Sequence, residues 1–183
     1  MTGDGDRTSL RLQMRERRRA LPAAERERAA LAACHHLLSL GLPRPGSRIA
    51  AYLPVAGELD PGPILDWARR RGCRIHVPVI TPGQRSRMRF ASLRGPLRAN
   101  RFGIPEPDAS ACVDGRWLDL VLLPCVAFDE HGARLGMGAG FYDRHFAFLR
   151  HRQAWRRPRL IGLGYAFQRV APLAPRSWDV PLW

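Results

Sequence analysis

The chain has 183 residues, a hydrophobic content of 45% and a formal net charge of +14 at pH 7. These values are typical of a globular protein with a core of ordinary size, and no apolar run is long enough to span a bilayer as a helix. The charge favours anionic ligands such as nucleotides, polyglutamates or nucleic acids, although we expect most of the arginines to form a solvated surface.

The N-terminal part predicts two helices. Residues 1–8 are polar and lack the apolar segment of a secretory signal, so we expect a short flexible tail there and a single domain over residues 9–183. Ser9 is placed to cap a helix over residues 10–20. A second helix is expected over residues 23–40, where apolar side chains recur at helical spacing.

Strands and helices then alternate along the chain. We expect strands at residues 48–53, 74–80, 88–93, 118–123 and 159–165, helices at 64–70 and 141–150, and mostly loop at 95–107. This alternation predicts an α/β three-layer sandwich with a largely parallel central sheet, of the Rossmann-like type. The continuous apolar run at 118–123 is typical of a central strand that is covered on both faces.

A glycine-rich segment follows this strand. Gly136, Gly138 and Gly140 stand at every second position, and such a loop brings main-chain N–H groups close to a ligand because glycine has no Cβ. Unpaired amides at the start of a helix attract anions. Asp143 is a hard oxygen donor that suits Mg²⁺ beside phosphate. A tight turn explains alternating glycines equally well, but together with Asp143 and Arg134 they indicate a phosphate-binding loop.

Ligands of open α/β sheets bind at the carboxyl ends of the strands. The glycine loop and the loop that contains Glu58 both follow strands, so we expect them to face one cleft. By itself, Glu58 would be interpreted as an ordinary loop carboxylate.

Four cysteines are spread along the chain, at Cys34, Cys73, Cys112 and Cys125. None forms a C-x-x-C pair, so we expect neither a zinc site nor a redox pair. They are interpreted as thiols in a reducing compartment, which together with the N-terminus predicts a cytoplasmic protein.

Taken together in chain order, these segments resemble those of the 5-formyltetrahydrofolate cyclo-ligase family, whose members are also called methenyltetrahydrofolate synthetases. The resemblance extends from about Arg7 to Leu182. It is carried by residues 10–22, 52–60, 102–107 and 124–144, followed by 162–168 and 178–182.

The resemblance implies an α/β sandwich enzyme that converts 5-formyltetrahydrofolate and MgATP to 5,10-methenyltetrahydrofolate, ADP and phosphate. The cofactor would be Mg²⁺, with ATP as co-substrate, and the folate would include polyglutamylated forms. Attack of the formyl oxygen on the γ-phosphate would turn that oxygen into a good leaving group, after which N10 closes the ring. We expect a monomer with neither a specific nucleic-acid partner nor a membrane partner.

The resemblance also implies site residues. For ATP it implies Arg7, Arg11, Arg134, Leu135, Gly136, Met137, Gly138, Ala139, Gly140, Phe141 and Tyr142. For the folate it implies Leu53, Glu58, Gly138, Ala139, Gly140, Phe141 and Tyr142. For Mg²⁺ it implies Asp143 and Asp179, and as catalytic residues Tyr142 and Arg134.

Other functions remain open at this point. Relatives usually carry lysine where Arg7 stands, often carry glycine or lysine at Ala139, and usually continue further after the segment matched by residues 178–182. A catalytically weak or inactive paralogue that binds folate or nucleotide is therefore the main alternative. A basic nucleic-acid-binding protein is disfavoured, because the arginines are dispersed and no RNA-recognition or helix-turn-helix signature is present.

Overall fold

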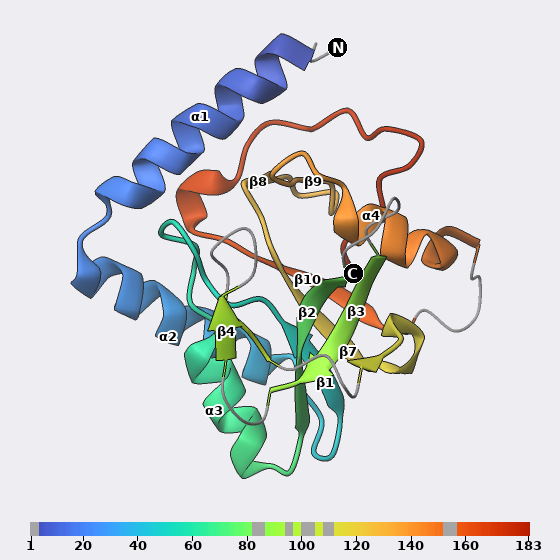
Figure 1. The fold of residues 1–183 in the computed structure, drawn as a ribbon. Helices are drawn as coiled ribbons and strands as arrows, with labels where there is room; N and C mark the ends of the chain where they lie inside the picture. Colours follow the sequence, from blue (N-terminus) through green and yellow to red (C-terminus); the bar gives the residue numbers. More distant parts are fainter. Residues whose placement is uncertain (1–3, 82–86, 94–96, 100–104, 108–111, 152–156) are drawn as a thin grey trace.

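A computed structural model describes residues 4–81, 87–93, 97–99, 105–107, 112–151 and 157–183 (Figure 1). The central sheet contains β1 (Arg48–Ala51), β2 (Arg74–Thr81), β3 (Arg87–Ser92), β6 (Cys112–Val113), β7 (Leu120–Pro124) and β10 (Arg159–Leu163). Their order is β10–β7–β1–β2–β3–β6. Strand β1 is parallel to β2 and β7, and β7 is parallel to β10, whereas β3 and β6 are antiparallel to their neighbours. The predicted largely parallel sheet is confirmed.

The remaining elements surround this sheet. The helices are α1 (Asp4–Ala20), α2 (Ala23–Ser39), α3 (Gly62–Arg70) and α4 (Phe141–Phe146), with 3₁₀ turns η2 (Gly115–Trp117), η3 (Ala147–His151) and η4 (Ala166–Gln168). Two small antiparallel sheets pair β4 (Leu97–Ala99) with β5 (Pro105–Pro107) and β8 (Ala127–Phe128) with β9 (Arg134–Leu135). None of the helices in the described ranges is long and apolar enough to cross a membrane.

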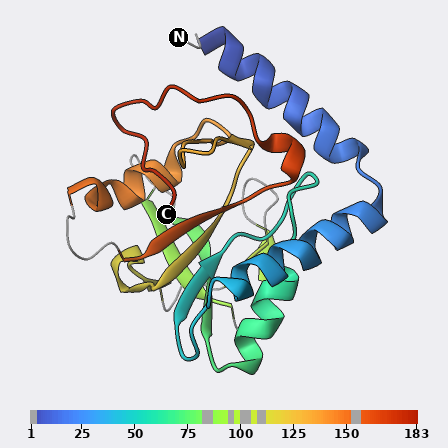
Figure 2. The ribbon, with the colours of Figure 1, turned by 180° about the vertical axis from the view of Figure 1, so that it is seen from behind.

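The apolar run of β7 is buried on both faces, as its composition predicts. Leu120 and Leu122 pack in one core cluster with α2 and α3, which lie side by side (Figure 2). Val121 and Leu123 point the other way and pack in a second cluster with Phe146 of α4. Because successive side chains of a strand alternate between the faces, four consecutive apolar residues supply both cores and produce the three layers.

Helix α1 begins earlier than expected. Residues 4–8 are helical, so a flexible tail over residues 1–8 is wrong for this part, and Ser9 lies inside the helix instead of capping it; residues 1–3 are outside the described ranges. The reason is tertiary, because the Arg7 side chain donates a hydrogen bond to the carbonyl of Ala174. Further along, Met14 packs against the β8–β9 hairpin, and Figure 1 shows α1 lying along this side of the molecule.

Several expected bounds are shorter in the structure. The helix expected over 141–150 ends at Phe146 and continues as a 3₁₀ turn, and the strand expected over 159–165 ends at Leu163. The expected loop at 95–107 contains the short strands β4 and β5, and the rest of it lies outside the described residues. The two shortened bounds lie at element ends, where helices and strands fray and the last helical turn is often 3₁₀.

Candidate active site

A cavity of about 180 Å³ lies at the carboxyl end of β7. Three parts of the chain that are distant in sequence form it: α1, the stretch from Pro124 and β9 through the glycine loop to the start of α4, and the C-terminal segment. The lining residues are Arg7, Arg11, Pro124, Arg134, Leu135, Gly136, Met137, Gly138, Ala139, Gly140, Phe141, Tyr142, Asp143, Arg176, Trp178 and Asp179. The fold thus gathers in one cavity all the residues that the resemblance implied for ATP and Mg²⁺.

The glycine loop presents unused main-chain donors. Gly138 and Gly140 have φ angles of +104° and +62°, which side chains with a Cβ rarely adopt. Within the described part of the chain, no main-chain amide of residues 136–143 donates a hydrogen bond. The loop carbonyl of Gly136 instead accepts a bond from Arg11 Nε at 2.9 Å. The loop is therefore held by its oxygen atoms while its N–H groups remain available to an anion.

Asp143 is held in place by two donors. Its Oδ1 accepts hydrogen bonds from Arg134 Nη2 at 2.7 Å and from the amide of Val180 at 3.1 Å. Arg134 also donates to the carbonyl of Val180, and its side chain is only 6% exposed. The guanidinium of Arg134 thus ties the glycine loop, α4 and the C-terminal segment together. This arrangement favours a role in orienting Asp143 over direct contact with a reacting group.

Asp179 stands on the same cavity wall. Its Oδ2 accepts a hydrogen bond from the amide of Arg176 at 2.9 Å and lies 4.0 Å from Arg7 Nη1. The Arg7 side chain is 9% exposed, so helix α1 brings a nearly buried positive charge to the carboxylate. Arg7 and Asp179 stand near opposite ends of the chain, and the fold brings them together at the cavity.

The two carboxylates of the cavity lining are donors of the kind that Mg²⁺ prefers beside phosphate. Mg²⁺ commonly binds through one or two protein carboxylates and completes its shell with water and substrate phosphates. Oδ2 of Asp143 and Oδ1 of Asp179 take no hydrogen bond from any residue in the described ranges. Those ranges contain no cluster of three or more His, Cys, Asp or Glu side chains that could hold a metal ion. Such an ion would therefore depend on its phosphate ligands.

The two residues implied only for the folate lie outside this cavity lining. Leu53 is half-buried in the segment after β1, and Glu58 is 9% exposed in the turn before α3. Glu58 Oε1 lies 3.8 Å from Arg18 Nη1, and Glu58 Oε2 accepts a hydrogen bond from the amide of Val55 at 3.2 Å. Burial raises the pKa of Glu58, and the Val55 N–H and the Arg18 charge oppose that rise.

Tyr142 belongs to the glycine-loop cavity. It lines the cavity, and its pKa is raised mainly by burial and further by the charge of Glu58. The expected common cleft for the glycine loop and the Glu58 loop stays a prediction. Cys125, at the end of β7, is also nearby, and burial raises the pKa of its thiol to about 12.

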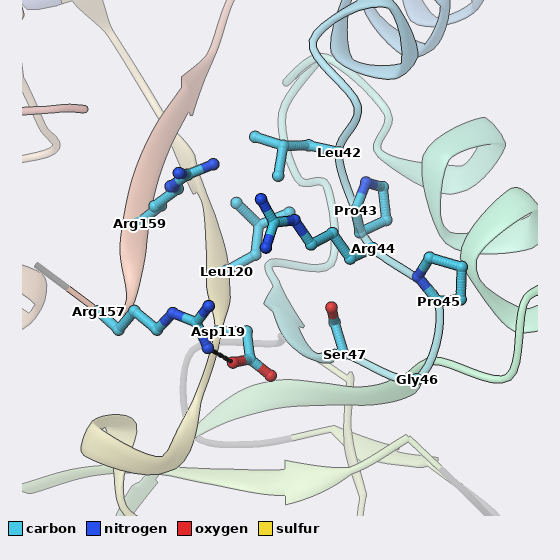
Figure 3. Close-up of a pocket in the computed structure, with 10 residues that line it drawn as sticks. All are labelled: Leu42, Pro43, Arg44, Pro45, Gly46, Ser47, Asp119, Leu120, Arg157 and Arg159. Atoms are coloured by element: carbon cyan, nitrogen blue, oxygen red, sulfur yellow. Dashed lines mark hydrogen bonds and ion pairs between the residues drawn. The ribbon is translucent and has the colours of Figure 1, made fainter. Parts of the chain in front are cut away.

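A larger cavity, of about 270 Å³, occupies the opposite edge of the sheet (Figure 3). It lies where β1, β7 and β10 begin, and it contains none of the residues implied for ATP, folate or metal. Arg44 and Arg159 face it from two segments, while Arg157 Nη1 donates to Asp119 Oδ1 at 3.0 Å. Its position is opposite to the edge at which open α/β sheets bind ligands.

Sequence reasoning missed three residues at the site. Arg176 and Trp178 line the cavity, and the Arg176 guanidinium lies 5.3 Å from the Trp178 ring centroid. Trp178 is 55% exposed and presents its ring at the cavity wall. The third residue is Arg18, which is hidden within a run of three arginines. Only its burial distinguishes it from its neighbours.

Comparisons with known proteins identify the family of the chain. Residues 4–183 match the 5-formyltetrahydrofolate cyclo-ligase family. The chain is 34% identical to the 5-formyltetrahydrofolate cyclo-ligase of Escherichia coli K12, over 92% of this chain and 93% of that protein. It is 32% identical to the enzyme of the same name from Haemophilus influenzae, over 97% and 95% of the two chains.

Solved structures show the same fold. The NMR structure of Aquifex aeolicus 5,10-methenyltetrahydrofolate synthetase superposes with a TM-score of 0.77 at 28% identity, covering 96% of this chain and 86% of that one. The synthetase from Mycoplasma pneumoniae superposes with a TM-score of 0.74 at 24% identity, over 97% and 95%. With the family match extending over almost the entire sequence, the chain belongs to the 5-formyltetrahydrofolate cyclo-ligase family.

Proposed function

We propose that the chain converts 5-formyltetrahydrofolate and MgATP to 5,10-methenyltetrahydrofolate, ADP and phosphate. The observation that carries the proposal is the glycine loop, whose unused amides border a cavity that also contains Asp143, Asp179, Arg7 and Arg11. Phosphoryl transfer requires positioning and charge neutralisation more than covalent chemistry from the protein. Amides, arginines and carboxylates around one cavity are suited to that task.

The proposed reaction has two steps. The formyl oxygen attacks the γ-phosphorus as the bond to ADP breaks, which converts that oxygen into a phosphate leaving group. N10 then attacks the formyl carbon, the carbon–oxygen bond breaks, and N10 loses its proton as phosphate departs. The protein contributes by holding the two substrates in line, because a correctly oriented attack avoids most of the entropic cost of the encounter.

Each part of the cavity has a role in this scheme. The loop amides of residues 136–142 and the Arg11 side chain would bind the phosphates. Asp143 and Asp179 would hold Mg²⁺, which when bound neutralises phosphate charge. Glu58 would accept hydrogen bonds from the amino and ring N–H groups of the pterin. Tyr142, in the cavity lining, would line the reacting centre.

The proposal includes a cytoplasmic monomer that accepts monoglutamyl and polyglutamyl folates. Cys34, Cys73, Cys112 and Cys125 all lie in the described ranges and are free thiols, which supports a reducing compartment. The positive charge around the cavity supports binding of additional glutamate carboxylates.

A direct assay tests the function. Purified protein is mixed with MgATP and 5-formyltetrahydrofolate, and the near-ultraviolet absorbance of the methenyl product is followed, with ATP omitted as the control. ATP-dependent product formation supports the proposal. Binding of both substrates without product would instead favour the alternative of an inactive paralogue.

A further inference from the structure

Arg18 is the most unusual polar residue of the structure. Its side chain is 1% exposed, which makes it one of the largest fully buried side chains. Among the described residues, its Nε and Nη2 atoms have no hydrogen-bond partner. The nearest opposite charge is Glu58, with 3.8 Å between Arg18 Nη1 and Glu58 Oε1. A buried cation with so few partners calls for an explanation.

Stability does not supply that explanation. Moving two charges out of water is costly, and the mutual attraction of the pair repays this cost only when the geometry is excellent and the remaining donors are satisfied. Here the contact is long and two donors of Arg18 are unsatisfied. Replacing a buried ion pair with apolar residues of similar volume is often neutral or stabilising. A functional reason for keeping the charges is therefore favoured.

The main chain around Glu58 is also braced by α1. Gly57 has a φ of +76°, and a Cβ at this position would lie 2.9 Å from the carbonyl oxygen of Arg18. Tyr165 Oη donates to the carbonyl of Gly57 at 3.2 Å, and the Tyr165 ring stacks on Phe167. The Arg17 guanidinium lies 4.4 Å from the Phe167 ring centroid. The end of α1 thus fixes the turn that carries Glu58 from two sides.

One face of α1 spans both regions of the site. Arg7 and Arg11 line the cavity of the glycine loop, Met14 packs on the β8–β9 hairpin, and Arg18 reaches Glu58. At 1.5 Å per residue, Arg7 and Arg18 are about 16 Å apart along the helix axis. A single rigid element therefore sets the distance between the nucleotide groups and Glu58.

We propose that Arg18 is a positioning residue for the folate substrate, which holds the Glu58 carboxylate in one orientation together with the Val55 amide. The inference rests on the proposed function, because it assigns Glu58 to the pterin. With Arg18 on one oxygen and Val55 on the other, the remaining lone pairs of Glu58 are directed for donors of the pterin. Arg18 itself acts through Glu58 and stays out of contact with the reacting atoms.

The first test separates substrate-specific effects from general ones. Arg18→Met removes the charge and retains the length of the side chain, and Arg19→Met is the matched control because Arg19 is exposed on the same turn. We expect Arg18→Met to raise the folate KM by about tenfold or more, with the ATP KM within about twofold of wild type. Equal changes of both KM values, or an unchanged folate KM, would overturn the proposal.

A pH profile gives a readout that a purely structural role would not change. The groups that interact with Glu58 are Arg18, Tyr52, Cys125 and Tyr142, and the last three have raised pKa values and are uncharged near neutrality. Without Arg18, the pKa of Glu58 rises further, because burial is then opposed only by Val55. The folate KM of Arg18→Met should therefore fall as pH rises from mildly acidic to mildly alkaline. A profile parallel to wild type would contradict the proposal.

A double variant tests the coupling. Glu58→Gln removes the charge that Arg18 holds, so adding Arg18→Met should raise the folate KM by less than about twofold further. An additive rise would mean that Arg18 acts independently of Glu58, against the proposal. Should Arg18→Met alone fail to fold in thermal unfolding, Arg18→Gln, which also removes the charge, replaces it. A folate KM equal to wild type in the glutamine variant would also overturn the proposal.

Failure of the function and failure of this inference give different results. If the wild-type protein neither forms methenyl product nor binds 5-formyltetrahydrofolate in calorimetry, the function and the inference both fail. If the wild type is active but the Arg18 variants have the same kinetics as the Arg19→Met control, the function stands and the inference fails.

Discussion

The sheet has one cavity at its amino-terminal edge, where the parallel strands begin, and another at its carboxyl edge, where they end. Both cavities contain several arginines, but they differ in whether the nearby main-chain amides donate hydrogen bonds. At the amino-terminal edge, the amides of Gly46, Ser47 and Arg48 all donate within the protein. At the carboxyl edge, the amides of residues 136–143 donate to nothing in the described ranges. The cavity at the amino edge is the larger one, about 270 Å³ against about 180 Å³. Unused donors therefore identify the candidate site better than size or arginine content.

The carboxylates differ in the same way. Asp119 at the amino edge uses both oxygens, one for Arg157 and one for the amide of Arg48. Asp143 at the carboxyl edge uses Oδ1 twice and leaves Oδ2 without a donor among the described residues. The first pattern is that of a structural residue, and the second leaves room for a metal ion.

The largest expected effect follows from removing the carboxylate at the carboxyl edge. Asp143→Ala should lower kcat by about 100-fold or more, because a ligand of the magnesium ion is lost, while binding of 5-formyltetrahydrofolate stays near the wild-type level. Steady-state kinetics and calorimetry measure the two quantities. Asp143→Asn, which keeps an acceptor for Val180, controls for loss of structure. Native turnover in both variants would refute the metal assignment.

The next largest effect concerns the glycine loop. Gly138→Ala forces a Cβ onto a φ of +104°, which costs about 1–3 kcal/mol and displaces the amides. We expect the ATP KM to rise by about tenfold and the folate KM to change less. Gly46→Ala is the matched control, because Gly46 also has a positive φ, of +74°, but lies at the amino edge. If both variants changed the ATP KM equally, the contrast between the edges would be lost.

A moderate effect is expected at the folate end. Glu58→Gln keeps the shape of the side chain but removes the charge, so the folate KM should rise by about tenfold while the ATP KM stays nearly constant. The sign of the pH effect follows from the raised pKa of Glu58: in the wild type, folate affinity should fall as pH falls through that pKa, and in Glu58→Gln this dependence should disappear. A larger rise in the ATP KM than in the folate KM would contradict the assignment of Glu58 to the pterin.

The smallest effect is expected at the amino edge. Arg157→Ala breaks an ion pair whose side chains are 53% and 36% exposed, so the free energy of unfolding should fall by less than about 1 kcal/mol. Arg44→Ala should behave similarly. Both variants should keep kcat and both KM values within about twofold of wild type. A strong loss of activity would show that charge at this edge matters to catalysis.

Local sequence patterns predicted much of the fold. The run at residues 118–123 predicted a strand covered on both faces, and the strand–helix alternation predicted the parallel sheet; both are confirmed. The tail expected over residues 1–8 was wrong from residue 4 onward, because the helix there is stabilised by a contact of Arg7 with Ala174, 167 residues away. No local pattern contains information of that kind.

In the candidate site, too, some features follow from the local sequence and others only from the tertiary structure. The amino-acid sequence alone determined which chemical groups are present: glycines that permit positive φ at 138 and 140, a carboxylate at 143 and a loop carboxylate at 58. Only the tertiary structure decided that Arg18, among three adjacent arginines, faces Glu58, and that Arg7 meets Asp179. The physical reason is that backbone geometry and periodicity act over a few residues, whereas burial and charge pairing depend on which distant segments the packed core brings together.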